Sequence, residues 1–253
     1  MARDDVVLEV DRLSRSFGAL AALSGVSFAV SRGEVFSVIG PNGAGKSTLF
    51  NVISGLYAPT AGRVRFLGED VTGLPPETIN RRGLAKTFQI TNVFREISVF
   101  ENVRVAAQSR APVSGRAASL WRRPDVTAPV MGLLDAFGLG PRRDEPAGHL
   151  SHGEQRYLEI CLALATEPRL LMLDEPTAGM TPGETKDATS LIREIVRARG
   201  LTLLLIEHDM SVVMGISDRV AVLHFGETIA QGTPEAIRND PKVIDAYLGG
   251  ADD

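Results

Sequence analysis

The chain has 253 residues, of which 44% are hydrophobic and 23% are charged, and its formal net charge is −4. This length suffices for one large α/β domain, alone or with a small subdomain, and the slightly acidic balance gives no general electrostatic case for nucleic-acid binding. No apolar run approaches the length that spans a membrane, and the N-terminal MARDDVVLEV lacks the pattern of a secretory signal. We therefore expect neither a membrane-spanning segment nor a secretory signal.

The first part of the chain predicts short strands. Runs of β-type residues cover 6–10, 26–30, 34–39 and 63–67, and Gly or Ser residues separate several of them, as turns require. After residue 48 the pattern alternates between strand and helix, which is typical of an α/β fold with a parallel sheet.

The motif GPNGAGKST follows the third of these strands and precedes an expected helix over residues 49–53. A glycine-rich turn between a strand and a helix N-terminus forms a phosphate cradle, because its backbone N–H groups point inward. We expect Lys46 to reach the β- and γ-phosphates and Ser47 to offer its hydroxyl to Mg²⁺. An accidental glycine-rich turn is the alternative. The candidate ATP-binding residues of this loop are Gly40, Pro41, Asn42, Gly43, Ala44, Gly45, Lys46, Ser47 and Thr48.

The middle of the chain changes character. Gln89 follows an expected short strand over residues 84–88, where its amide can reach Mg²⁺ or the attacking water. Residues 95 to 165 are mainly helical in pattern, with Ser98 and Glu101 spaced as a capping box. Residues 109–125 are rich in Ser, Ala, Gly and Pro and carry four arginines. A solvated loop is the favoured interpretation of that segment, and contact with lipid headgroups or a partner is the alternative.

The segment LSHGEQ begins another predicted helix. Ser151 and Glu154 have capping-box spacing, and Gly153 allows close approach to the helix N-terminus. A capped helix N-terminus also attracts anions, so it can bind the γ-phosphate of a nucleotide held by a second subunit. Cys161, the only cysteine, lies farther along this helix in an apolar run, and we expect a buried thiol.

Two expected parallel strands, Leu170–Asp174 and 201–206, end in candidate catalytic residues. Asp174 is placed to hold Mg²⁺, and Glu175 to orient or deprotonate the attacking water. His208 follows the second strand and can donate to the γ-phosphate. Between the strands, Thr181, Pro182 and Glu184 predict a capped helix start and Gly200 its end. Near the C-terminus, runs 219–224 and 227–231 flank Gly226 as a hairpin.

These motifs, in this order, resemble an ABC transporter ATPase over nearly the whole chain. The resemblance rests on GPNGAGKST, Gln89, LSHGEQ, LLMLDEP and EHD. It implies a P-loop NTPase of the α/β class with a RecA-like core at about 1–92 and 166–235. It further implies an N-terminal antiparallel β subdomain, an inserted α-helical subdomain at about 93–165, and a tail at about 236–253. Phe17 corresponds by position to the aromatic residue that stacks on adenine, an ordinary core or strand residue being the alternative.

The resemblance also implies function. Two ATPase subunits associate head to tail and bury two MgATP molecules, each between the loop of one subunit and the signature of the other. The signature here is Ser151, His152, Gly153 and Glu154, with His152 and Glu154 departing from the usual Gly and Gln. Catalysis falls to Glu175, His208 and Lys46, and metal binding to Ser47, Gln89 and Asp174. The implied place is the cytoplasmic face of the inner membrane, against integral permease subunits that work with a substrate-binding protein.

The C-terminal third is similar to the branched-chain amino acid importer ATPases, specifically the subunit with the longer helical arm. The matching segments are PTAGMTPGET, the run from EHDMSVVMG to PEAIRND, and VIDAYLGG. Relatives that handle urea or short amides, or that export lipopolysaccharide, have similar tails, so the cargo stays open. The choice between a homodimer and a pair with a paralogue stays open too. A soluble ABC ATPase of translation or DNA repair is less favoured, since the chain has one cassette and no sustained heptads. A regulatory module without turnover is disfavoured by the intact Asp174 and Glu175.

Overall fold

The computed structural model describes residues 5–87, 93–109 and 125–248. The chain divides into two compact units. The first contains residues 1–84 and 169–253, and the second contains residues 85–168.

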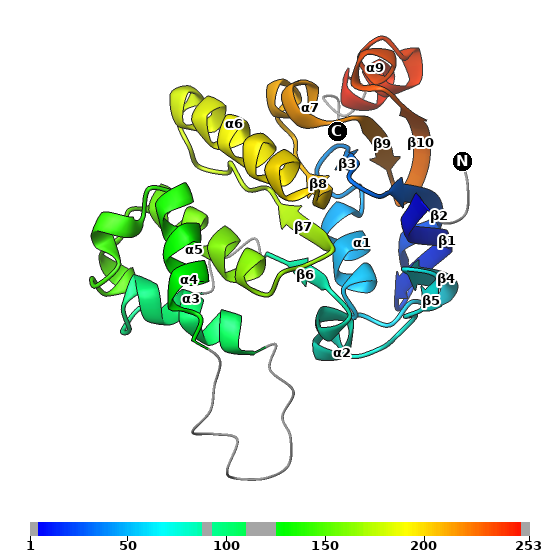
Figure 1. The fold of residues 1–253 in the computed structure, drawn as a ribbon. Helices are drawn as coiled ribbons and strands as arrows, with labels where there is room; N and C mark the ends of the chain where they lie inside the picture. The colour runs from blue at the N-terminus through cyan, green and yellow to red at the C-terminus, as the bar shows by residue number, and fades with distance from the viewer. Residues whose placement is uncertain (1–4, 88–92, 110–124, 249–253) are drawn as a thin grey trace. The chain divides into compact units, whose positions relative to one another are not determined.

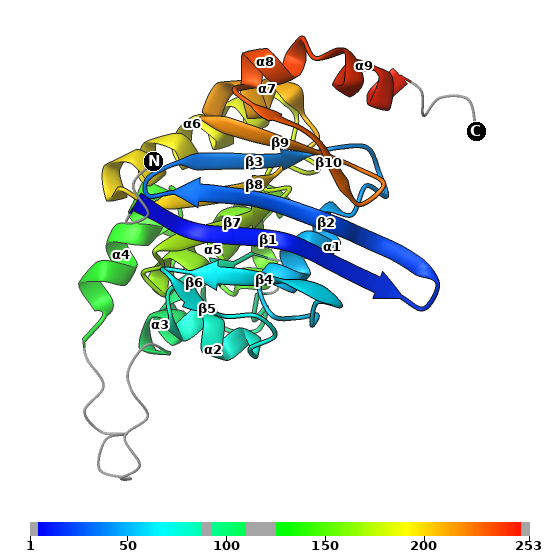
Figure 2. The same ribbon diagram turned by 90° about the vertical axis from the view of Figure 1, so that its right-hand side faces the viewer.

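An antiparallel sheet opens the first unit, with strand order β2-β1-β4-β5. The predicted strands at 6–10 and 26–30 are confirmed but are parts of longer strands that pair along most of their length. Figure 2 shows this long hairpin in blue. The strands are β1 (Val6–Phe17), β2 (Leu20–Ser31), β4 (Ala61–Phe66) and β5 (Glu69–Asp70).

The central sheet has the order β10-β9-β3-β8-β7-β6. Strand β3 pairs in parallel with β8 on one side and β9 on the other, and β7 continues the parallel set beyond β8. All residues of β3, β7 and β8 are buried, which explains their continuous apolar sequences. The predicted hairpin of β9 and β10 is confirmed. The strands are β3 (Val35–Ile39), β6 (Leu84–Lys86), β7 (Leu170–Asp174), β8 (Thr202–Ile206), β9 (Arg219–His224) and β10 (Glu227–Gly232).

Along the chain of the first unit, helices come after strands, so that α1 follows β3, α6 follows β7 and α7 follows β8 (Figure 1). The predicted start of α6 is confirmed, since Thr181 and Glu184 form a reciprocal capping box and Pro182 is the first helical residue. Gly200 ends this helix in the left-handed conformation, with φ +58. The helices are α1 (Lys46–Ile53), α2 (Pro76–Arg81), α6 (Pro182–Arg199), α7 (Met210–Ile216), α8 (Pro234–Arg238) and α9 (Pro241–Leu248).

Apart from the end of β6, the regular structure in the described residues of the second unit is helical. Helices α3 (Val99–Gln108), α4 (Thr127–Ala136) and α5 (His152–Ala165) pack against one another, with short 3₁₀ turns η3 (Gly140–Arg142) and η4 (Ala147–His149) before α5. At the start of α3, one half of the predicted capping box is present, since the Ser98 side chain accepts from the Glu101 N–H. The Glu101 carboxylate instead accepts from Arg104 Nε at 2.9 Å. Cys161 is a buried thiol, as expected. Across the described part of the chain, no helix combines the length and apolarity that a membrane crossing needs.

Candidate nucleotide-binding site

The phosphate loop runs from the end of β3 to the start of α1. Gly40, Gly43 and Gly45 have positive φ angles of 151, 79 and 100°, a region that L side chains rarely adopt. A Cβ on Gly40 would lie 2.1 Å from the Leu223 carbonyl oxygen, and one on Gly45 would lie 2.5 Å from that of Ala22. The backbone therefore requires glycine at these two positions both for its conformation and for the space available.

Lys46 is the first residue of α1, and its ammonium group turns back over the loop. The Nζ donates to the carbonyl oxygens of Gly40 at 2.7 Å and Pro41 at 3.0 Å. Burial lowers the pKa of Lys46, while the nearby carboxylates of Glu175 and Asp174 oppose that shift. The lysine, the two acids and the loop backbone thus share one site. Ser47, the next residue, is exposed.

Asp174 and Glu175 lie where β7 ends, at the carboxyl edge of the parallel sheet. Asp174 is buried and pairs in register with Ile206, the last residue of β8. Glu175 has a φ of 47°, and its N–H donates to the Ile206 carbonyl oxygen at 3.0 Å. This left-handed turn directs the chain away from the strand directly after the two acids.

His208 brings a second polar group to the same edge. Its Nδ1 lies 3.8 Å from Glu175 Oε1, and its side chain is 58% exposed, whereas that of Glu175 is only 19% exposed. The two predicted catalytic residues are therefore neighbours, with the imidazole at the solvent side and the carboxylate set deeper.

Glu207 is a functional candidate that the sequence reasoning missed. Its side chain is fully buried. Oε1 accepts from the backbone N–H and the hydroxyl of Thr177, at 3.2 and 2.7 Å, and Oε2 accepts from the His208 N–H at 3.3 Å. Burial raises the pKa of Glu207, and these donors partly oppose the rise. Glu207 thus links the loop after Glu175 to the residue that carries the imidazole.

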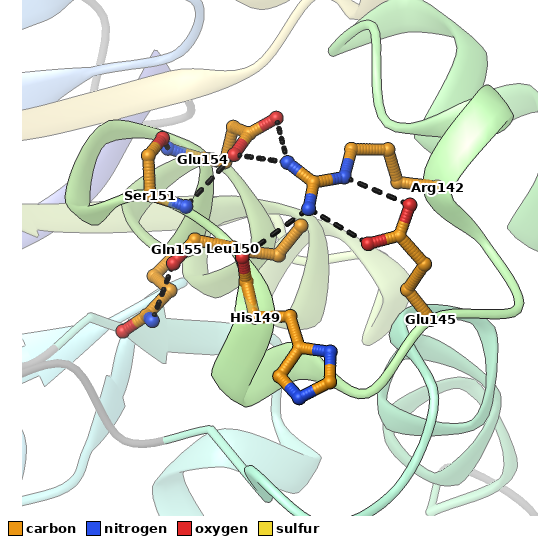
Figure 3. A network of polar contacts seen from close by, with 7 residues as sticks. All are labelled: Arg142, Glu145, His149, Leu150, Ser151, Glu154 and Gln155. Atoms are coloured by element: carbon orange, nitrogen blue, oxygen red, sulfur yellow. Dashed lines mark hydrogen bonds and ion pairs between the residues drawn. The ribbon is translucent and has the colours of Figure 1, made fainter.

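The N-terminus of α5 in the second unit is built on a charged network (Figure 3). Glu154 Oε2 accepts from the Ser151 N–H at 2.8 Å, and the Ser151 hydroxyl accepts from the Glu154 N–H at 3.3 Å, so the predicted capping box is confirmed. Both Glu154 oxygens also accept from Arg142 Nη1, at 2.9 and 2.8 Å. Glu154 therefore supports the terminus from within, while Ser151 and His152 are exposed.

Arg142 could not be found from the motif alone, since it lies on η3, away from α5 in the sequence. Its guanidinium also binds the Glu145 carboxylate at 2.7 Å and the His149 carbonyl oxygen at 3.2 Å. Burial alone would raise the pKa of Glu154, but hydrogen bonds from Ser151 and Arg142 hold it below its ordinary value. A Cβ on Gly153 would meet no atom within 4 Å, so this face of the helix start is open to approach.

Phe17, the predicted adenine-stacking residue, is the last residue of strand β1 and is 40% exposed, so it is a strand residue outside the core. The Arg15 guanidinium carbon lies 4.5 Å from the centre of its ring, and Tyr57 packs edge-on at 5.4 Å. Phe17 therefore lies in a cluster with a cation and a second aromatic ring, and its role in stacking on adenine stays a prediction. Gln89 lies outside the described residues.

The oxygen donors present suit a hard divalent cation. Asp174 supplies a buried carboxylate, Glu175 supplies a second one beside it, and Ser47 supplies an exposed hydroxyl at the helix start. Mg²⁺ takes few protein oxygens and completes its shell with phosphate oxygens and water, so this donor set fits that ion when a nucleotide is bound.

Comparisons with known proteins agree with this geometry. A family model described as "ABC transporter" matches residues 23–178, which contain the phosphate loop, the capped start of α5, and Asp174 with Glu175. A second model, described as "Branched-chain amino acid ATP-binding cassette transporter", matches residues 227–253.

Individual relatives match almost the whole chain. The high-affinity branched-chain amino acid transport ATP-binding protein BraF of Pseudomonas aeruginosa is 44% identical, over 97% of this chain and 98% of its own length. LivG of Escherichia coli, which carries the same description, is 43% identical over the same shares. An ATP-binding cassette of an ABC transporter, solved in its ADP conformation, superposes with a TM-score of 0.84 and 34% identity, over 96% of this chain and 99% of that one.

Proposed function

Since the chain belongs to the ABC transporter ATPases, proteins that bind and hydrolyse ATP, we propose that it powers the import of branched-chain amino acids. One observation carries the choice of cargo. The tail at 227–253 matches the branched-chain family, and the relatives named for this transport are 43 to 44% identical over 97% of the chain.

The proposed chemistry divides the site by residue. The loop glycines and Lys46 hold the phosphates, and Ser47, Asp174 and Gln89 hold Mg²⁺, which supplies charge neutralisation on the phosphate oxygens when bound. Glu175 accepts a proton from, or orients, the attacking water, because its carboxylate is partly shielded and adjacent to the metal ligand. His208, beside it at 3.8 Å, donates toward the γ-phosphate.

We also propose that each working site needs a second ATPase subunit. Ser151 and Gly153 lie at an open, capped helix start, which suits an anion, and the γ-phosphate held by the partner's loop is that anion. ATP then joins the two subunits and favours the closed arrangement by its differential affinity. Hydrolysis removes the joining group and lets the subunits separate.

The helical segment at about 93–165 is proposed to pass this motion to integral membrane permeases. The RecA-like core then comprises about 1–92 and 166–235, with a tail from 236. In this proposal the chain works as a peripheral subunit on the cytoplasmic face of the inner membrane, and a substrate-binding protein delivers the cargo.

A reconstitution experiment tests the cargo. The tagged chain is purified from its native membranes in mild detergent with its permease partners, and the complex is placed in liposomes containing MgATP. The substrate-binding protein encoded beside this chain's gene is added outside the liposomes, together with labelled leucine or urea. We expect ATP-dependent leucine uptake that the Glu175→Gln variant abolishes. Uptake of urea but not leucine would reject branched-chain amino acids as the cargo. Purification without any membrane partner would favour a soluble ABC ATPase.

A further inference from the structure

The far end of the β1–β2 hairpin lies beside the phosphate loop. Arg15 on β1 pairs with Leu23 on β2, and the Leu23 side chain comes within 3.1 Å of where a Cβ on Gly45 would lie. Phe17 is two residues farther along β1, toward the end of the hairpin. Two residues of a strand span about 7 Å, so the ring is near enough for the base of a nucleotide whose phosphates bind the loop.

Two neighbours cover one side of the Phe17 ring. The Arg15 guanidinium carbon lies over the ring at 4.5 Å from its centre, and Tyr57 packs edge-on with its ring centre at 5.4 Å. The same guanidinium carbon lies 5.7 Å from the centre of the Tyr57 ring. These three separations make an acute angle at Phe17, so Arg15 and Tyr57 lie on the same side of its ring. Neither covers the opposite face, and Phe17 is 40% exposed, so that face is open to a ligand.

Arg15 is itself fixed by the chain that follows α1. Its Nη1 donates to the Ala58 carbonyl oxygen at 2.7 Å. The same two segments are joined again where the Thr60 N–H donates to the Ser14 carbonyl oxygen at 2.8 Å and the Ser16 N–H donates to the Thr60 hydroxyl at 3.0 Å. The buried Nε of Arg15 has no hydrogen-bond partner in the described part of the chain. The Ala58 carbonyl and the two rings therefore hold the guanidinium, and a cation removed from water interacts more strongly with an aromatic face.

We propose that Arg15 is a positioning residue for the adenine of ATP, which backs the Phe17 ring and holds its open face toward the base. A ring that is fixed in advance loses less conformational freedom when a base stacks on it, so Arg15 raises the affinity without touching the nucleotide. Stacking suits this ligand, because every base has a flat π-face that packs on aromatic side chains. The inference rests on the proposed function, since it takes the loop as the ATP site and Phe17 as the stacking residue.

Removal of the guanidinium tests the proposal in the full-length chain. Arg15→Met keeps an unbranched apolar stem but loses the cation. We expect the KM for MgATP to rise about threefold to tenfold, the effect of one cation–π contact, with kcat within about twofold of wild type. Inorganic tripolyphosphate carries the phosphates of ATP without its base, so its inhibition constant against ATP hydrolysis should stay within about twofold of wild type. The matched control is Arg65→Met on β4, which removes an arginine that pairs with Glu9 at the surface and should leave the KM unchanged.

The effect of Arg15 must pass through the Phe17 ring. Arg15→Met is therefore repeated in a Phe17→Leu background, where no ring remains to be held, and there it should change the KM by less than about twofold. A rise of about threefold or more in that background would overturn the proposal.

Two other results would also overturn it. One is a KM for Arg15→Met within about twofold of wild type while the wild-type chain hydrolyses ATP. The other is an equal rise in the KM for ATP and in the inhibition constant of tripolyphosphate, which would mean that the substitution disturbs the phosphate loop and not the base. A wild-type chain without turnover would instead reject the proposed function.

Discussion

Glu207 accepts both the backbone N–H and the hydroxyl of Thr177 on a single carboxylate oxygen, in a fully buried position between two loops of the site. Thr177 lies two residues after Glu175, and Glu207 directly precedes His208. The hydrogen bonds between Thr177 and Glu207 therefore join the chain segment of Glu175, the proposed base, to that of His208. The relationship leads to a prediction about pH.

Glu207→Gln should make stability less dependent on pH. The folded pKa of Glu207 is raised above its ordinary value of 4.5 by burial, so the folded state keeps a proton that the unfolded state loses. The free energy of unfolding therefore falls as pH rises from 4.5 to the raised pKa, and is constant above it. The glutamine removes this loss. Denaturant unfolding is measured from pH 4.5 upward. The free energy of unfolding of the variant should rise relative to that of wild type as pH rises, and the same pH dependence in both proteins would contradict the raised pKa of Glu207.

Glu175→Gln should separate ATP binding from hydrolysis. The amide keeps the size of the side chain but cannot accept a proton, so we expect turnover to fall by about a hundredfold or more while ATP affinity stays near wild type. In the proposed cycle the variant accumulates as an ATP-bound dimer, which size-exclusion chromatography with MgATP detects. Turnover close to wild type would remove Glu175 from the role of base.

Lys46→Ala should lose ATP binding itself. The ammonium group donates to the Gly40 carbonyl oxygen at 2.7 Å, and its removal takes away a positive charge expected to bind the phosphates, so we expect affinity to fall by about a hundredfold. Equilibrium dialysis with labelled ATP measures this. Lys186→Ala on α6 changes an exposed lysine and serves as the control, which should bind ATP normally. Equal binding by both variants would refute the assignment.

Arg142→Ala should impair hydrolysis without impairing ATP binding by the isolated chain. Loss of the guanidinium frees Glu154 and Glu145 and loosens the start of α5, whereas the phosphate loop belongs to the other unit. We expect turnover to fall about threefold to thirtyfold. Arg143→Ala removes an adjacent, more exposed arginine that binds its neighbour Asp144, and it should keep turnover. A shared loss in both variants would indicate a general effect of charge.

The sequence was sufficient for the elements whose signal is local. Continuous apolar runs predicted β7 and β8, and the capping boxes at Ser151 and Thr181 predicted the starts of α5 and α6, because each depends only on neighbouring residues. The lengths of β1 and β2 were not predictable, since their extensions at 11–17 and 20–25 pair with several register shifts and therefore lack a regular alternation in the sequence.

The contacts that support the site could not be predicted either, because they join residues that are far apart in the sequence. Arg142 reaches Glu154 across 12 positions of sequence, and Glu207 reaches Thr177 across 30. No spacing rule encodes such pairs, so motif residues could be identified and their supports could not.

The central claim is that each hydrolytic site combines the phosphate loop of one subunit with the α5 start of another. Two inactive variants test it directly. Lys46→Ala disables the loop, and Gly153→Asp places a negative charge at the helix start, where a Cβ meets nothing within 4 Å. Steady-state ATPase activity is measured for each variant alone, for a mixture of the two, and for wild type. The account predicts negligible turnover for each alone and restoration toward about a quarter of the wild-type rate on mixing, because half of the random dimers then hold one intact site. A mixture no more active than the sum of its parts, under conditions where wild type turns over, would contradict it.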